Sequence, residues 1–176
     1  MPDLFTRISP LSDIAIQGRF GADHGVPGVM FSLPAPSHMV TVIARKGKAK
    51  ALAQALKNFD ARWAGPDQYF VWGEPYETVS GKLKGLASCS DQSHGRVVIG
   101  IVGPHVRQVL AKGSPIDFHP AEFPVGKSAL TQMAHVGVHV TRVGADAFEI
   151  SVFRGFSESF WEWITEQAEE FGYQVT

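Results

Sequence analysis

The sequence has one cysteine, Cys89, among its 176 residues. A single thiol cannot form an internal disulfide, and it cannot supply the several thiolates that a zinc ribbon or an iron–sulfur cluster needs. A chain of this length can still bury a sizeable hydrophobic core without such cross-links. We therefore expect one ordinary globular domain, or two small halves that share one core.

An excess of charge of either sign is also missing. Sixteen Lys and Arg residues against seventeen Asp and Glu residues give a formal net charge of -1. No strong positive field exists to attract nucleic acid or an anionic membrane. The first residues lack the apolar core of a signal peptide, and no later run approaches the length of a membrane span. We predict a cytoplasmic protein that binds neither nucleic acid nor membrane.

Nucleotide-binding and hydrolase motifs are absent. The segment 126–128 (Gly-Lys-Ser) matches the end of a phosphate-binding loop, but Ala121 occupies the position of its first glycine, and Pro124 has no N–H to offer a phosphate. The chain has no G-x-G-x-x-G stretch for a dinucleotide and no G-x-S-x-G nucleophile elbow. No nucleotide-binding role is therefore predicted for any of these segments.

Two histidines have the spacing of zinc ligands on a helix, but they do not lie on a helical pattern. His135 and His139 are four residues apart, and valines alternate with the residues around them as in a strand. Four strand residues span roughly 13 Å, which is too far to share one metal. Cys89 has no family signature around it. We predict no catalytic, cofactor-binding or metal-binding residue in this chain, and we expect both histidines on the polar face of a strand.

The first 37 residues contain many prolines and glycines and show no sustained helical or strand period. We predict an extended arm over residues 1–37. The alternative is a surface coil with a brief strand near residues 29–32.

Residues 38–176 are predicted to form a single globular unit with a first half, 38–90, and a second half, 91–176. Alternating and 3.6-residue hydrophobic patterns predict strands at 38–45, 68–73, 96–102, 128–134, 136–143 and 148–153, and helices at 47–59, 76–86, 105–111 and 157–171. Prolines and a glycine mark 114–127 as a connecting loop. This order of elements, with hairpin-like gaps between the late strands, is typical of an α+β fold with a largely antiparallel sheet.

The last helix carries an apolar side and an acidic side. Ser157 or Ser159 is predicted to cap its first turn, the latter in a capping box with Glu162. Glutamates four residues apart repel one another by roughly 0.2–0.5 kcal/mol per pair, and no lysine of the helix offsets them. Either a basic partner surface or plain solvation would relieve this repulsion.

Several segments, in this order and spacing, resemble the gamma subunit family of heterotetrameric sarcosine oxidase. They cover about two-thirds of the chain and comprise 65–67 (Gly-Pro-Asp), 91–104 from Asp-Gln-Ser-His-Gly-Arg to Val-Gly-Pro, 109–126 from Val-Leu-Ala-Lys-Gly to Gly, and 152–163 (Val-Phe-Arg-Gly-Phe-Ser-Glu-Ser-Phe-Trp-Glu-Trp). The chain departs from the family at Gly155, where Ser is usual, and at Ser114, where Cys is usual.

The resemblance implies both a fold and membership of an enzyme complex. The fold is similar to the folate-binding domains of the glycine cleavage T-protein and of tRNA-modifying GTPases, with two α+β halves of which the first is plait-like. The implied complex oxidatively demethylates sarcosine to glycine, passes the one-carbon unit to tetrahydrofolate and forms hydrogen peroxide. The alpha subunit would bind NAD and tetrahydrofolate, the beta subunit FAD and a shared covalent FMN, and the delta subunit zinc.

On this resemblance we expect a noncatalytic gamma subunit, with no cofactor of its own, that contacts the alpha, beta and delta subunits. The alternatives are a gamma-type subunit of a related N-methyl amino acid dehydrogenase, such as N-methylglutamate dehydrogenase, and a free-standing folate-binding protein. The candidate interface is a set of residues around the start of the last helix and along its acidic side: Phe153, Arg154, Phe156, Glu158, Glu162 and Glu166.

Overall fold

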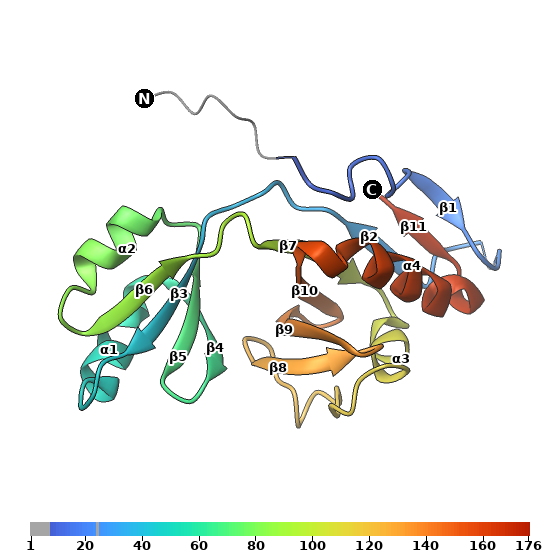
Figure 1. The fold of residues 1–176 in the computed structure, drawn as a ribbon. Coiled ribbons are helices and arrows are strands. Elements are labelled where there is room, and N and C mark those ends of the chain that lie inside the picture. The colour runs from blue at the N-terminus through green and yellow to red at the C-terminus, as the bar shows by residue number, and fades with distance from the viewer. Residues whose placement is uncertain (1–7, 24) are drawn as a thin grey trace. The chain divides into compact units, whose positions relative to one another are not determined.

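The computed structural model describes residues 8–23 and 25–176 and divides the chain into two compact units (Figure 1). The larger unit joins the beginning of the chain, up to Pro36, to Arg96–Thr176, and the smaller unit is Ser37–Gly95. These boundaries differ from the predicted arm at 1–37 and the single unit at 38–176 with halves at 38–90 and 91–176. Residues 1–7 and 24 of the predicted arm lie outside the described residues.

The smaller unit is a four-stranded antiparallel sheet, in the order β4-β5-β3-β6, with two helices. Its elements are β3 (Met39–Ala44), α1 (Ala49–Ala55) with a 3-10 turn η1 (Leu56–Asn58), β4 (Asp60–Gly65), β5 (Gln68–Trp72), α2 (Tyr76–Lys82) and β6 (Ala87–Asp91). The order βαββαβ with this sheet topology is a plait, as predicted for the first half of the chain. The strands β4 and β6 were not predicted.

One face of this sheet packs against both helices. Val40 and Val42 of β3 and Val71 of β5 are fully buried, and they share a hydrophobic cluster with Leu52 of α1 and Val79 of α2. Alternate residues of a strand point to the same face, so the β-branched run of β3 supplies both valines to the helices.

The larger unit contains a seven-stranded sheet in the order β1-β11-β2-β7-β10-β9-β8. Its strands are β1 (Gly18–Phe20), β2 (Val29–Ser32), β7 (Arg96–Val102), β8 (Ser128–Met133), β9 (Val136–Gly144), β10 (Ala147–Phe153) and β11 (Tyr173–Val175). All neighbouring strands are antiparallel except β11 and β2. The predicted α+β fold with largely antiparallel sheets is confirmed.

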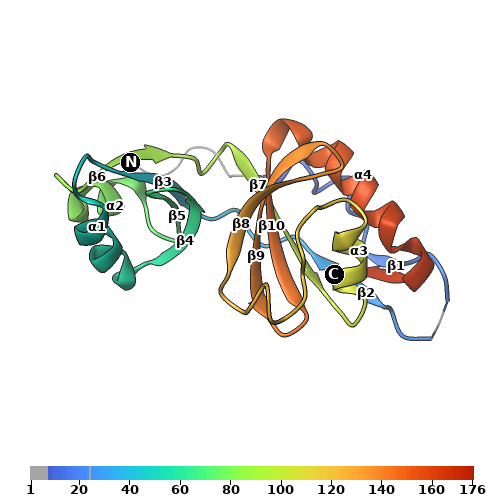
Figure 2. The same ribbon diagram turned by 90° about the horizontal axis from the view of Figure 1, so that it is seen from below.

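Two helices, α3 (Val106–Ala111) and α4 (Ser157–Ala168), pack on one side of this sheet (Figure 2). Ile99 and Ile101 of β7 and Ile150 of β10 are buried with Leu110 of α3 and Ile164 of α4 in one hydrophobic core. The amphipathic pattern of the last predicted helix therefore correctly identifies the buried side of α4.

The described part of the predicted arm belongs to this core and this sheet. Leu11 is fully buried, β1 pairs with β11, and β2 lies between β11 and β7. The brief strand near residues 29–32 was the alternative prediction, and its pairing partners lie far away in the sequence. Hydrophobic periodicity reports only local structure and cannot reveal pairing with distant strands. For that reason the sequence alone predicted an extended arm over residues 1–37.

The connecting loop before β8 is held by a buried arginine. Arg142 of β9 is 5% exposed, and its Nη1 donates to the carbonyl of Phe123 at 2.9 Å. Its Nε donates to the carbonyl of Gly144 at 3.1 Å, and Nη2 donates to that of Ala145. The guanidinium therefore ties the loop to the turn between β9 and β10.

The end of the chain differs from the predicted helix at 157–171. The α-helix ends at Ala168, a 3-10 turn η3 (Glu169–Phe171) follows, and the chain then enters β11. The reversal occurs at Gly172, which has a φ of 64°. A Cβ at this position would lie 2.2 Å from the carbonyl oxygen of Ala22, so only glycine fits the turn.

Candidate functional site

The six candidate interface residues follow one another from the end of β10 into α4. Phe153 ends β10, the 3-10 turn η2 (Arg154–Phe156) follows, and α4 begins at Ser157. Phe153 is 45% exposed and Phe156 is 55% exposed. Phe153 has an extended backbone and Phe156 ends the 3-10 turn, so two exposed phenylalanines flank the passage from β10 into α4.

Two arginines fix the surroundings of this pair. The guanidinium of Arg96 lies over the ring of Phe153, 4.0 Å from the ring centroid. Burial lowers the pKa of Arg96. Arg154 is exposed, and its Nη1 donates to the carbonyl of Ile8 at 3.2 Å. Phe153 is therefore covered from β7, and the turn before α4 is tied to the beginning of the described chain.

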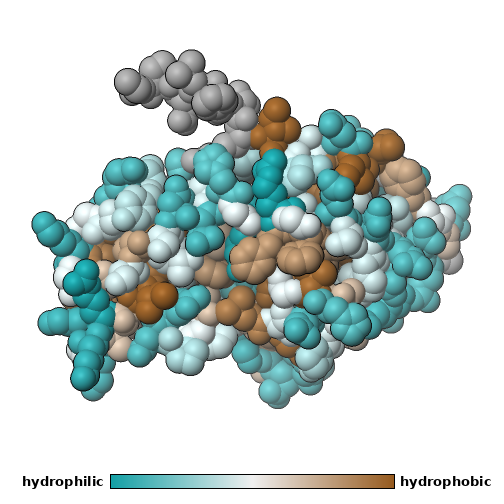
Figure 3. Space-filling model, in the orientation of Figure 1, coloured by the Kyte–Doolittle hydropathy of each residue, from teal (hydrophilic) through white to brown (hydrophobic). Residues whose placement is uncertain are grey.

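Glu158, Glu162 and Glu166 occupy successive turns of α4 and are all exposed. Among residues 8–23 and 25–176, no basic side chain forms an ion pair with any of these three carboxylates. Figure 3 shows a hydrophobic area where α4 begins and hydrophilic surface along the helix. The six candidate residues are thus all exposed, with two phenylalanines and Arg154 before the helix and three glutamates along it.

At the last turn of α4, a lysine of the same unit offsets negative charge. Lys112, which follows α3, donates from Nζ to the carbonyl of Gln167 at 2.7 Å and forms an ion pair with Glu170. A cation near the carboxyl end of a helix offsets the helix dipole. The glutamates earlier in the helix receive no such compensation from this lysine.

The predicted capping of α4 is wrong. The helix has Phe156 as its N-cap residue, with no side-chain capping hydrogen bond. The hydroxyl of Ser157 donates to the carbonyl of Arg154 at 2.8 Å, and that of Ser159 donates to the carbonyl of Phe156 at 3.2 Å. Because η2 runs directly into α4, its carbonyls compete for the hydroxyls that a capping box would use.

The tryptophans of α4 serve packing. Trp161 is 5% exposed within the core of the larger unit. Trp163 is half-buried, and its ring lies so close to Gly113 that a Cβ there would be 2.3 Å from Cζ2. Lys112 and Gly113, two residues on which the family resemblance rests, therefore join the end of α3 to α4.

The histidine pair does not assemble a site. His135 lies in the two-residue turn between β8 and β9, with a φ of 67°, and not on a strand as predicted. His139 lies on β9, opposite Ser151 of β10, and is 1% exposed. The turn takes two consecutive positive φ values, at Ala134 and His135, which is typical of a tight hairpin. Within the described part of the chain, no group of three or more potential metal ligands occurs.

Cys89 is half-buried on β6. Burial raises the pKa of its thiol, while the positive charge of Arg45 lowers it by a smaller amount. A raised pKa disfavours the thiolate, which is the reactive form of cysteine.

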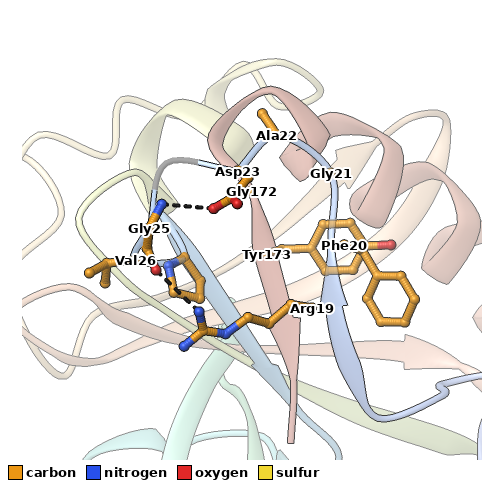
Figure 4. Close-up of a pocket in the computed structure, with 10 residues that line it drawn as sticks. Arg19, Phe20, Gly21, Ala22, Asp23, Gly25, Val26, Gly172 and Tyr173 are labelled. Atoms are coloured by element: carbon orange, nitrogen blue, oxygen red, sulfur yellow. Dashed lines mark hydrogen bonds between the residues drawn. The ribbon is translucent and has the colours of Figure 1, made fainter.

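A cavity of about 260 Å³ lies beside the turn after β1 (Figure 4). Its charged lining residues are Arg19 and Asp23. Arg19 Nη1 donates to the carbonyl of Gly25 at 3.1 Å, and Asp23 Oδ1 accepts from the amide of Gly25 at 2.9 Å. Both charged side chains thus bind the backbone of the loop itself, and both are exposed.

None of the helices in the described ranges combines the length and the apolar character that crossing a membrane would require.

Comparison with known proteins gives concordant matches. The model of the sarcosine oxidase, gamma subunit family matches residues 49–170. The sarcosine oxidase subunit gamma of Corynebacterium sp. (strain U-96) is 30% identical over 114 residues, which are 62% of this chain and 56% of that protein. The matched region is thus little more than half of the relative's length.

Two solved structures share the fold. A chain of the heterotetrameric sarcosine oxidase from Corynebacterium sp. U-96, in complex with pyrrole 2-carboxylate, matches with a TM-score of 0.80 and 25% identity over 94% of this chain and 96% of that chain. The glycine cleavage system aminomethyltransferase T from Bartonella henselae matches with a TM-score of 0.61 and 12% identity over 87% of this chain and 49% of that chain. The second likeness concerns the fold alone.

Proposed function

The chain belongs to the sarcosine oxidase gamma subunit family, and from this premise we propose that it is the gamma subunit of a heterotetrameric sarcosine oxidase. The observation that carries the proposal is the match to a chain of such an assembly over 94% of this chain and 96% of the other. This match covers a larger share of the chain than residues 49–170, which the family model matches.

In this proposal the complex converts sarcosine, tetrahydrofolate and oxygen into glycine, methylenetetrahydrofolate and hydrogen peroxide. The alpha, beta and delta subunits hold NAD, tetrahydrofolate, FAD, FMN and zinc, and the electrons from the N-methyl group reach oxygen through the flavins. This chain has no catalytic residue in the scheme. Its part is to supply folded surface to the larger subunits, and the exposed candidate residues at the start of α4 support this role.

The test is purification of the tagged chain from its source cells, with mass spectrometry of the recovered proteins and an absorbance spectrum of the sample. The proposal expects two larger flavin-bearing chains and a small zinc-containing chain to accompany it in fixed stoichiometry. A colourless chain that is recovered alone would contradict it. Calorimetry with tetrahydrofolate would then test the free-standing folate-binding alternative.

The substrate is tested on the recovered complex. We expect faster oxygen consumption and peroxide formation with sarcosine than with N-methylglutamate. Faster turnover of N-methylglutamate, or electron transfer to a carrier in place of oxygen, would assign the chain to a related N-methyl amino acid dehydrogenase.

A further inference from the structure

We propose that the outer face of α4, together with the phenylalanines that precede the helix, is a docking surface for a basic surface of a larger partner subunit. This α4 surface consists of Phe153, Phe156, Glu158, Glu162 and Glu166. The inference rests on the proposed function, because it names the chemistry of the partner that such a subunit meets.

The outer face of α4 carries a row of negative charge. Glu158, Glu162 and Glu166 follow one another at four-residue spacing and are exposed, and no ion pair within the described chain offsets them. Like charges at this spacing destabilise a helix, and acidic residues beyond the first turn gain nothing from the helix dipole. Glu158 lies in the first turn and is favoured by the dipole, so the uncompensated repulsion concerns Glu162 and Glu166, and a basic surface would complement the whole row.

Two exposed phenylalanines precede the row of glutamates. Phe153 and Phe156 are 45% and 55% exposed, whereas Phe160, one turn into α4, is fully buried. Protein interfaces favour aromatic residues at their centre and charged residues at their rim. The order of residues along this segment supplies both parts of such an interface.

Contacts within the chain hold Phe153 and α4 in position in the absence of a partner. Arg96 lies over the ring of Phe153 at 4.0 Å, and Lys112 binds the last turn of α4 through the carbonyl of Gln167. The half-buried ring of Trp163 packs on Gly113. A pre-organised surface loses less conformational entropy on binding.

The experiment uses the full chain, co-expressed with the other subunits of its complex and purified by a tag on this chain. The main variant reverses the row, with Glu158→Lys, Glu162→Lys and Glu166→Lys combined. A second variant replaces the same glutamates by glutamine, which keeps their size. The matched control reverses three exposed lysines of the smaller unit, with Lys46→Glu, Lys48→Glu and Lys50→Glu combined.

At low salt, we expect the lysine variant to recover at least about tenfold less flavin-bearing partner than the wild-type chain. The glutamine variant should give an intermediate loss. Both effects are expected because charges at the rim of an interface govern the association rate and its salt dependence. The reversed-lysine control should recover the wild-type amount. Phe156→Ala should weaken recovery at both low and high salt. Circular dichroism of each variant alone should match the wild type, since all substituted side chains are exposed.

The outcomes separate the two proposals. If the wild-type chain recovers the larger subunits and the lysine variant does so equally well, the α4 surface is refuted and the proposed function stands. If the wild-type chain recovers no partner, the proposed function fails and this inference fails with it. If the chain instead binds a second copy of itself, and both charge-reversal variants abolish that binding, the row docks on the lysines of another copy and the inference is overturned.

Discussion

Gly113 follows α3 at a point where the ring of Trp163 leaves no room for a side chain. A Cβ built on Gly113 would lie 2.3 Å from Cζ2 and 2.4 Å from Cη2 of that ring. Carbon atoms in van der Waals contact are about 3.5–4.0 Å apart, so Gly113→Ala forces the indole or α4 to move by roughly 1 Å. The φ of Gly113 is not left-handed, so the effect of the substitution arises from packing and not from backbone strain.

The expected loss follows from two opposing contributions. Overpacking of this kind costs about 1–3 kcal/mol, and replacing glycine by alanine returns about 0.4–1 kcal/mol through the unfolded chain. We therefore expect Gly113→Ala to lower the free energy of unfolding by about 1–2 kcal/mol, which is roughly 2–8 °C in Tm for a chain of this size. Trp163 is only half-buried and can tilt outward, so the loss stays in this range.

A double-mutant cycle tests the contact between Gly113 and Trp163. The free energy of unfolding is measured by urea denaturation for the wild type, Gly113→Ala, Trp163→Phe and the double variant. Phenylalanine lacks the part of the indole that contains Cζ2 and Cη2, so Gly113→Ala should cost almost nothing in its presence. The coupling free energy should be about 1 kcal/mol or more. Gly137→Ala is the control, because nothing lies within 4 Å of its Cβ position. Additive effects of the two substitutions, or a wild-type stability of Gly113→Ala, would refute the contact.

Three further results are expected. Arg142→Met should lower the free energy of unfolding by about 2–4 kcal/mol, because it leaves three backbone carbonyls without their charged donor. Arg154→Met removes one exposed hydrogen bond and should cost under about 1 kcal/mol in the same denaturation assay. Gly172→Ala should be more destabilising than Gly126→Ala, since both have positive φ but only the former would place a Cβ 2.2 Å from a carbonyl oxygen; equal losses would show that backbone strain alone matters. Burial raises the pKa of the Cys89 thiol in the folded chain above its ordinary value. The stability that the neutral thiol contributes is therefore fully present below the ordinary thiol pKa and is lost as the pH rises through the folded pKa. In pH-dependent denaturation, Cys89→Ala should remove this part of the alkaline decrease in stability.

Hydrophobic periodicity predicted the elements that are long and either amphipathic or alternating. The strands β7, β8, β9 and β10 and the helix α4 were placed within a few residues of their observed bounds. Each buries one regular face, so its own sequence contains the pattern that the core imposes. The exposure of the glutamates on the outer face of α4 was predictable on the same basis.

Short or mixed elements were missed because their stability comes from distant partners. The segment 60–65 has no regular alternation, and it is a strand because it pairs with β5. The three residues of β11 pair with β1 and β2, more than 140 positions earlier in the chain. The stacking of Arg96 on Phe153 likewise depends on the register of β7 against β10, which a linear pattern does not encode.

The residues that identify the family fall into two groups with different physical roles. Gly113 and Lys112 join α3 to α4, and Ser93 binds the start of β3 through the backbone amide of Met39 at 3.0 Å, so these residues are explained by the fold of each unit. Phe156 and Glu162 are exposed, and Glu162 forms no ion pair within the described chain. A substitution in the first group should therefore change unfolding first and assembly only as a consequence. A substitution in the second group should change assembly while leaving unfolding unaltered, and that difference separates an interface from a scaffold.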